Sequence, residues 1–409
     1  MTFKHLTLMG ASALSLVACQ TTALAPAPEM SVADIHDATL TLDTHIDIPL
    51  TYMGEIDPGV LTDELQVDLP KLETGKLDSG FWIVYTPQGE LADEGYAEAL
   101  GIAETRVKAI TKMTKTYPDV MEMAMTANDV RRIVGEGKHA VLIGMENAYP
   151  LGESVEDVSV WAERGVRYMG LTHFGHNQFG DSSNPNPERD SGPKWNGLSP
   201  LGQDLVRALN ENGIMVDTSH TGKATMMQAA DLSTTPIIAS HSGVKAIADT
   251  ERNLDDEQLR KIRDVNGVAQ MVALGSYVKR PTAEQEAASE ALNERFNLEK
   301  RNDYDALSEA DKALFDAERA KITAMEPEAT VSDFVDHIDH AVKVAGIDHV
   351  GIASDFDGGG GIIGWKDASE TENVTAELVR RGYTPDDISK IWGGNLLRVL
   401  AAVEAEAVN

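Results

Sequence analysis

Histidine and acidic residues recur along this sequence at the ends of apolar segments. The first pair is His45 and Asp47, which follow the apolar run that ends at Leu42. Side chains two residues apart on an extended chain point to the same side, so this pair presents a nitrogen beside a carboxylate oxygen. Zn²⁺ and similar divalent ions bind such ligands in proteins. Because one His-x-Asp pair is a weak signal, the hypothesis depends on how often the pattern returns.

The pattern returns at the ends of five further β-type segments. The residues in these positions are Glu146, His173, His220, His241, Asp355 and Asp357. Counting His45, four of the eleven histidines stand where a β-type segment ends.

Eight β-type segments alternate with helical patterns. The expected strands cover residues 38–43, 79–85, 139–145, 166–171, 213–217, 236–240, 267–273 and 348–353. The expected helices cover 95–116, 127–136, 154–163, 199–211, 222–232, 255–265, 331–345 and 385–403. Near-continuous Val, Ile and Leu runs indicate strands buried on both faces, as in a parallel sheet. This alternation predicts a (β/α)8 barrel, in which catalytic groups stand at the C-terminal strand ends.

Two segments interrupt the alternation. Residues 174–198 form a loop rich in Gly, Asn, Pro and Ser after the fourth strand, where barrel enzymes keep binding loops. Residues 279–330, between the seventh strand and its helix, are rich in Glu, Ala, Lys and Arg. We interpret them as a charged excursion of one or two solvated helices. Because it leaves from a strand's C-terminal end, it could overhang the active site.

Two further histidines, His337 and His340, lie three residues apart within the expected helix 331–345. This spacing could mimic a metal site. Because a helix that flanks the barrel would carry both side chains away from its mouth, we expect them on a solvated helix face.

The residues at the strand ends include more potential ligands than one structural zinc requires. They are His45, Asp47, Glu146, His220 and His241. A closed structural site prefers four ligands, often cysteines. Two ions about 3.5–4 Å apart would accommodate all five, with a carboxylate shared between them. Glu146 is the expected bridge because a carboxylate has two oxygens, and the nitrogens of His220 and His241 favour zinc.

The N-terminal residues are similar to the leader of a bacterial lipoprotein. Residues 1–18 combine a short basic start with an apolar segment too short to span a bilayer. The sequence Leu-Val-Ala-Cys at 16–19 resembles a lipobox, which predicts lipidation of Cys19. Gln20 in the next position resembles the signal for the outer membrane, and the alternative is an ordinary export signal. We expect a tether at 19–34 and a catalytic domain at 35–409 that faces the periplasm.

Length and charge narrow the classes of function. The 409 residues suit a (β/α)8 barrel with insertions. Asp and Glu total 66 against 35 Lys and Arg, a net charge of −31. Such an acidic surface repels phosphate backbones, so we expect no nucleic-acid partner.

Taken together, the motifs resemble the membrane (renal) dipeptidase family of metallopeptidases, a branch of the amidohydrolase-like barrels. The motifs are Asp-Thr-His-Ile-Asp at 43–47, Gly-Met-Glu at 144–146, Gly-Val-Arg-Tyr at 165–168, Leu-Thr-His at 171–173, Gly-Leu-Ser-Pro-Leu-Gly at 197–202, Asp-Thr-Ser-His at 217–220, Ser-His-Ser at 240–242, Arg-Asn at 252–253 and Asp-Phe-Asp-Gly at 355–358. The resemblance covers roughly residues 35–400.

The resemblance implies a role for each site residue in the hydrolysis of dipeptides. His45, Asp47 and Glu146 would hold one Zn²⁺. Glu146, His220 and His241 would hold the other, with a water or hydroxide between the ions. His173 would contact the substrate at the scissile carbonyl, Arg252 would bind its carboxylate, and Asp355 would handle protons. Asp357 is the second candidate for that last role, and a homodimer is expected.

Two other interpretations remain open. The first is another metal hydrolase of the amidohydrolase type, acting on a lactone, cyclic amide, β-lactam or phosphoester. The absence of a lysine at the end of the fourth strand, where such relatives carry a carbamate bridge, argues against it. The second is a lipoprotein that binds a metal ion without catalysis.

Overall fold

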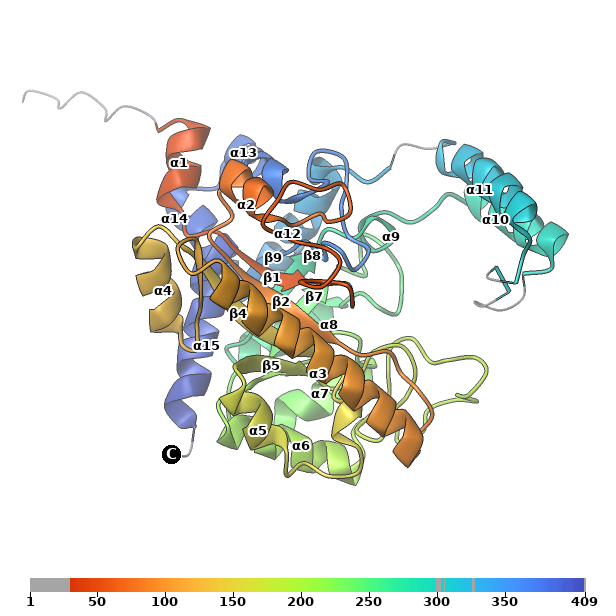
Figure 1. Cartoon of the computed structure of the whole chain (residues 1–409), viewed down its shortest axis with the longest axis horizontal. Coiled ribbons are helices and arrows are strands. Elements are labelled where there is room, and N and C mark those ends of the chain that lie inside the picture. Colours follow the sequence, from red (N-terminus) through yellow and green to blue (C-terminus); the bar gives the residue numbers. More distant parts are fainter. Residues whose placement is uncertain (1–29, 299–302, 305, 326–327, 408–409) are drawn as a thin grey trace, which may run out of the picture. The chain divides into compact units, whose positions relative to one another are not determined.

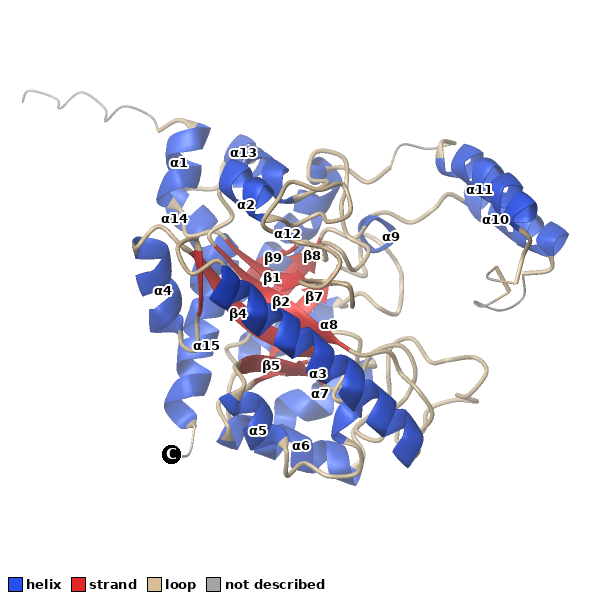
Figure 2. Ribbon diagram, in the orientation of Figure 1, coloured by secondary structure: helices blue, strands red, loops and turns tan. Residues whose placement is uncertain are grey.

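The computed structural model describes residues 30–298, 303–304, 306–325 and 328–407. Eight parallel strands lie side by side in the order β1-β2-β4-β5-β6-β7-β8-β9. Where β9 and β1 end, the N–H of Asp355 donates to the carbonyl of His45 at 3.1 Å, and the N–H of Asp47 donates to the carbonyl of Phe356 at 2.9 Å. These bonds bring the last strand back to the first, with helices around the strands (Figures 1 and 2). The expected (β/α)8 barrel is therefore confirmed.

The barrel strands are short and buried. They are β1 (Leu42–Ile46), β2 (Ser79–Tyr85), β4 (His139–Glu146), β5 (Val166–Gly170), β6 (Met215–Asp217), β7 (Ile238–Ser242), β8 (Val268–Val272) and β9 (Val350–Ala353). The short strand β3 (Met121–Met123), which the sequence did not predict, pairs with β4 outside the barrel path.

The expected start of the first strand at residue 38 is wrong, because α1 (Val32–Ala38) ends there. Contacts with residues far away in the sequence stabilise this helix. His36 is buried, and its Nδ1 lies 2.8 Å from the hydroxyl of Thr375. As a result β1 begins later and carries His45 within the strand itself.

Apart from the helices at Leu69–Gly75 and Glu372–Arg380, which the sequence did not predict, the helices mostly follow the expected ranges. They are α2 (Leu69–Gly75), α3 (Asp93–Thr116), α4 (Ala127–Gly135), α5 (Val158–Glu163), α6 (Pro200–Glu211), α7 (Lys223–Leu232), α8 (Asp256–Asp264), α12 (Val331–Ala345), α13 (Glu372–Arg380), α14 (Pro385–Ser389) and α15 (Asn395–Glu406). At the start of α6, the hydroxyl of Ser199 accepts a hydrogen bond from Gly202, which is a regular N-cap before a proline.

The helix expected at 385–403 is interrupted by a π-helical turn at Lys390–Gly394. Gly393 packs against the carbonyl of Leu40, 2.9 Å from where a Cβ would stand. The indole of Trp392 donates to the hydroxyl of Thr375 at 2.9 Å. These contacts explain the departure from a regular helix, since π-turns form where local packing requires a wider turn.

The absence of a side chain at Gly144 leaves space for the ring of Tyr168, which extends toward β1. A Cβ on Gly144 would overlap the ring of Tyr168, so the close approach of these residues requires a glycine. The ring of Tyr168 is fully buried, and its hydroxyl donates to the carbonyl of Thr44 at 3.1 Å. The hydroxyl of Thr44 lies 2.8 Å from the carbonyl of Ser240, so β1 is also linked to β7.

The charged excursion after the seventh barrel strand contains two helices, as expected. It follows α9 (Gly275–Val278) and includes α10 (Ala283–Phe296) and α11 (Glu309–Thr323). Within these two helices the buried residues are Leu292 and Phe315, so most of their surface is solvated. In the part of the chain that the structure describes, no helix combines the length and apolar character needed to cross a membrane.

The expected solvated position of His337 is wrong. Its side chain is buried under α9, where Nε2 lies 2.9 Å from the carbonyl of Val278. Its Nδ1 accepts a hydrogen bond of 2.8 Å from the N–H of Val244. His340, which is partly exposed, pairs with Asp256 at 2.7 Å. Helix α12 therefore also packs against the segments that follow β7 and β8, and His337 is hydrogen-bonded to both of them.

Candidate active site

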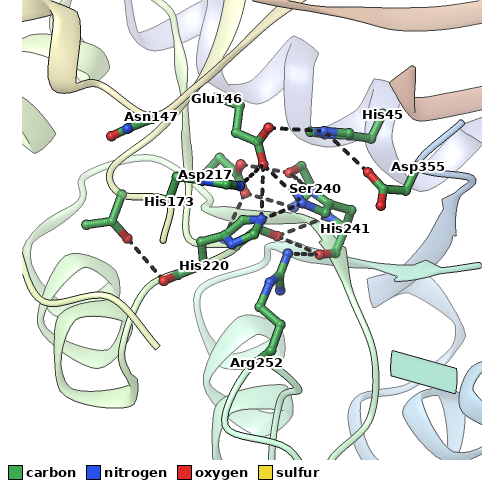
Figure 3. Close-up of polar contacts among 12 residues, drawn as sticks. His45, Glu146, Asn147, His173, Asp217, His220, Ser240, His241, Arg252 and Asp355 are labelled. Carbon is green, nitrogen blue, oxygen red and sulfur yellow. Dashed lines mark hydrogen bonds and ion pairs between the residues drawn. The ribbon is translucent and has the colours of Figure 1, made fainter. Parts of the chain in front are cut away.

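The structure brings the histidines and acids of the strand ends into one cluster at the C-terminal face of the barrel. His45 lies in β1, Glu146 ends β4 and His241 lies in β7. Asp47, His173, His220 and Asp355 lie just beyond β1, β5, β6 and β9. Figure 3 shows how the side chains of this cluster converge.

The carboxylate of Glu146 stands between two groups of nitrogen atoms. Its Oε2 lies 3.6 Å from Nε2 of His45. Its Oε1 lies 3.0 Å from Nε2 of His220, 3.3 Å from Nε2 of His241 and 3.8 Å from Nε2 of His173. The two oxygens therefore face different partners (Figure 3). This arrangement suits a carboxylate that bridges two ions.

The group on the Oε1 side has the dimensions of a zinc site. The Nε2 atoms of His220 and His241 lie 2.9 Å apart, and each lies within 3.3 Å of Glu146 Oε1. Ligands about 2.0–2.2 Å from a tetrahedral Zn²⁺ are separated by roughly 3.3–3.6 Å. The two nitrogens and one oxygen could therefore surround one such ion with little adjustment.

The group on the Oε2 side contains an unsatisfied nitrogen. Nε2 of His45 is buried without a hydrogen-bond partner among the described residues. Carboxylate oxygens of Asp47 and Asp355 lie 3.4 and 3.8 Å from it. On the other edge of the ring, Nδ1 lies 2.9 Å from the hydroxyl of Tyr168. Because that hydroxyl donates its one proton to Thr44, Nδ1 is the donor in this hydrogen bond, and Nε2 is the nitrogen that could bind a cation.

The ionisation states favour cation binding. Burial lowers the pKa values of His220 and His241 well below their usual range, so both imidazoles are neutral and offer lone pairs. Burial would raise the pKa of Glu146, but the surrounding histidines lower it well below its usual value. Burial opposes charge on His45, but Glu146 and Asp47 raise its pKa well above the usual value, so a cation at its Nε2 would have to displace a proton. The cluster thus combines anionic oxygens with nitrogen lone pairs.

Asp355 also lies close to Nε2 of His45, but its carboxyl group has a raised pKa. Burial raises the pKa of its carboxyl to about 8, and the neighbouring carboxylates of Asp47 and Glu146 add to this effect. Its backbone is in the left-handed region, with φ of 60°. One of its carboxylate oxygens lies within 4.8 Å of a ring nitrogen of His45 and one of His241, so it is near enough to act as a further ligand.

Asp357 is hydrogen-bonded to a neighbouring loop. Its carboxylate accepts a hydrogen bond of 2.7 Å from the N–H of Gln66, and its own N–H donates to the Gln66 side chain at 2.7 Å. Burial raises its pKa to about 6. Although it borders the cavity, its position serves to hold the loop.

His241 is oriented by a short hydrogen-bonded chain from the preceding strand. The carboxylate of Asp217 accepts hydrogen bonds from the N–H and the hydroxyl of Ser240, at 2.8 and 2.7 Å. The hydroxyl of Ser240 lies 2.9 Å from Nδ1 of His241. Such partners hold a ligating imidazole in one orientation.

The cavity above the cluster is small. Its volume is about 290 Å³, near the lower end of small-molecule sites. It is lined by Asp47, Ile48, Pro49, Tyr85, Arg106, Glu146, His173, Phe174, His220, His241, Leu274, Tyr277, Asp355, Asp357 and Gly358. A ligand of about two residues fits such a space better than a long peptide.

The structure places Arg252 beside this cavity rather than in its lining. The side chain is 3% exposed. Nη1 donates to the hydroxyl of Ser242 at 2.7 Å and Nη2 donates to the carbonyl of His241 at 2.5 Å. The guanidinium lies 5.3 Å from the ring centre of Tyr277. Its Nε is buried without a partner among the described residues, so one donor remains for a ligand.

Sequence reasoning missed several residues of the cavity wall. Tyr85 is the last residue of β2, and its ring meets that of His173 at 4.9 Å. Tyr277 belongs to α9, at the start of the excursion. The position of Tyr85 at a strand end was a usable signal. Arg106 lies within α3, where its position follows no strand end and carried no such signal.

The family was identified by comparison with known proteins. A family model described as membrane dipeptidase (Peptidase family M19) matches residues 30–409. The chain belongs to this family. It is therefore a metallo-dipeptidase, as expected, and proteins of this family depend on metal ions.

Individual relatives agree with this assignment. The dipeptidase tcpJ of Claviceps purpurea is 32% identical over 335 residues, which cover 80% of this chain and 67% of that protein. The crystal structure of the probable dipeptidase PvdM from Pseudomonas aeruginosa is 36% identical, with a TM-score of 0.83, and the match covers 92% of this chain and 98% of that one.

A more distant structure shows the fold alone. It is a metallo peptidase from Rhodobacter sphaeroides, liganded with a phosphinate mimic of the dipeptide L-Ala-D-Ala. It is 22% identical, with a TM-score of 0.67, and the match covers 89% of this chain and 99% of that one.

The hydrogen bond between Tyr168 and His45 generates a prediction about metal affinity. Tyr168→Phe removes the acceptor that fixes the protonation and orientation of His45. We expect metal affinity to fall by about 10–100-fold, the usual effect of losing such a partner. Competition with a chromogenic chelator measures it.

The control for this prediction is Tyr52→Phe, which removes the hydroxyl of another buried tyrosine, bonded to the sulfur of Met113. It should leave metal affinity unchanged. Equal affinities for Tyr168→Phe and the wild-type protein would show that His45 needs no such partner.

Proposed function

We propose that this protein is a dinuclear zinc dipeptidase. The observation that carries the proposal is the position of Glu146, whose two oxygens face separate groups of ligands. His45 and Asp47 would complete one Zn²⁺ site, and His220 and His241 the other. Bound at these positions, two Zn²⁺ ions would supply Lewis acidity and lower the pKa of an attacking water.

The remaining polar residues would bind the substrate and move protons. His173 borders the cavity beside Glu146, where it could donate to the scissile carbonyl. Asp355 could accept a proton from the attacking water and return it to the leaving amine, since a carboxyl that titrates near neutral pH suits both steps. Arg252 would hold the C-terminal carboxylate of the dipeptide through its unpaired Nε and so place the peptide bond over the cluster.

The function is tested by comparing Ala-Ala with its C-terminal amide. Wild-type enzyme should prefer the free acid, because a charged hydrogen bond to Arg252 is lost in the amide. Arg252→Ala should lose most of this preference, on the order of 10–100-fold in kcat/KM. Arg260→Ala, which alters an exposed arginine on α8, is the control and should keep the preference. Equal cleavage of acid and amide by the wild-type enzyme would contradict the role of Arg252.

A second test separates the proton carrier from the ligands. Purified protein should contain close to two equivalents of zinc. Asp355→Asn should retain both and lower kcat by on the order of 10²–10⁴, the range for general acid–base groups. Asp357→Asn should cost far less, because that carboxylate holds Gln66. Loss of zinc from Asp355→Asn, as measured by elemental analysis, would identify Asp355 as a ligand instead.

We further propose that the protein is a homodimer anchored through a lipid on Cys19 to the outer membrane, facing the periplasm. Cys19 lies outside the described residues, and the proposal rests on the sequence at 16–20. Cys19→Ser should release active enzyme into the soluble fraction, where sedimentation should give twice the mass of one chain. If the wild-type protein is already soluble after cell fractionation, the lipid anchor is refuted.

A further inference from the structure

Arg106 is a buried cation at the cavity that none of the roles above uses. It projects from α3, which packs against β2 (Figure 1), and its side chain is 9% exposed. It borders the same cavity as Asp47 and Glu146. Among the described residues no carboxylate forms an ion pair with it. Burial lowers the pKa of its guanidinium, and the more distant negative charges of Asp47 and Glu146 oppose this effect. A buried guanidinium without an anionic partner is unusual, since buried charges are normally paired.

The side chain is held rigidly with part of its guanidinium unused. Nε donates to the carbonyl of Ile48 at 3.1 Å, and Nη1 donates to the carbonyl of Tyr85 at 3.0 Å. The guanidinium lies 5.4 Å from the ring centre of Tyr85. Nη2 forms no hydrogen bond to a described residue. A guanidinium fixed in this way can bind an anion without losing much further side-chain entropy.

Arg106 and Arg252 stand on opposite walls of the barrel mouth. Arg106 is bonded to the carbonyl that ends β2, whereas Arg252 is bonded to residues of β7. In the barrel order, β2 is the second and β7 the sixth of eight strands, so three strands separate them in either direction. Glu146 lines the same cavity as Tyr85 of β2 and His241 of β7.

We propose that Arg106 binds an anionic side chain on the N-terminal residue of the substrate, so that the enzyme prefers dipeptides that begin with glutamate or aspartate. This inference rests on the proposed function, in which Arg252 holds the C-terminal carboxylate. A dipeptide held at the β7 wall extends its N-terminal residue across the cluster toward β2, where Arg106 stands. A carboxylate there accepts a hydrogen bond between opposite charges, which is stronger than the bond that a neutral amide oxygen accepts.

A purely structural role for Arg106 would have different consequences. Its bonds to Ile48 and Tyr85 join the ends of β1 and β2. If this were its whole purpose, losing it would lower the hydrolysis of every dipeptide to the same degree. Binding of an acidic side chain instead changes the ratio between acidic substrates and their neutral isosteres.

The experiment compares Glu-Ala with Gln-Ala, which differ in charge but hardly in shape. Wild-type enzyme should show a kcat/KM for Glu-Ala on the order of tenfold or more above that for Gln-Ala. Arg106→Gln should reduce this ratio to about one, mainly through the KM for Glu-Ala, and Arg106→Lys should restore part of it. Arg189→Gln is the control, because Arg189 also donates to a backbone carbonyl, that of Gln88, but does not line the cavity.

Each result has a distinct meaning. Hydrolysis of Gln-Ala and Ala-Ala by the wild-type enzyme without a preference for Glu-Ala overturns this inference and leaves the proposed function standing. That comparison needs no variant, so it holds even if Arg106→Gln fails to fold. An equal loss for both substrates in Arg106→Gln also overturns it. Loss of the acid-over-amide preference for Ala-Ala in Arg106→Gln would make Arg106 the clamp for the C-terminus. If no dipeptide is cleaved, the proposed function fails and this inference fails with it.

Discussion

A carboxylate enclosed by protein remains ionised only where positive charge or hydrogen-bond donors replace its lost water. Glu146 is 5% exposed, and imidazoles approach it from β1, β7 and the loops after β5 and β6. Two of these rings bring nitrogen to nitrogen at 2.9 Å, an arrangement that neutral imidazoles sustain only with a proton or cation between them. The surrounding structure serves to hold these mutually unfavourable groups together.

The barrel achieves this because residues of one strand support candidate ligands on another. Tyr168 on β5 holds His45 on β1, and it can do so because Gly144 leaves space for its ring. Asp217 at the end of β6 holds Ser240, whose hydroxyl meets His241. Since these supports are buried and bonded on both sides, the candidate ligands are already positioned, which would lower the cost of binding an ion.

Much of this site could be predicted because its residues follow strands. In a parallel barrel, sequence periodicity locates strand ends, and strand ends share one face, so His45, Glu146, His220 and His241 could be grouped without coordinates. Arg106 could not, because a helix that covers the barrel gives no signal for the one side chain that reaches inward. His337 was misplaced for a related reason: its burial depends on α9 and on the loop around Val244, far away in the sequence. The early start assigned to the first strand likewise ignored the distant contact of His36 with Thr375.

The closure of the barrel has a consequence for biosynthesis. The N–H of Asp355 bonds the carbonyl of His45, so the first and last barrel strands meet at the residues of the cluster. Contacts between such distant segments are slow to form, because a long chain must first be brought together. A ribosome-bound polypeptide that still lacks β9 therefore has His45 without Asp355 beside it. We therefore expect the peptidase to stay latent throughout its own synthesis and to become active only when the two ends of the domain have joined.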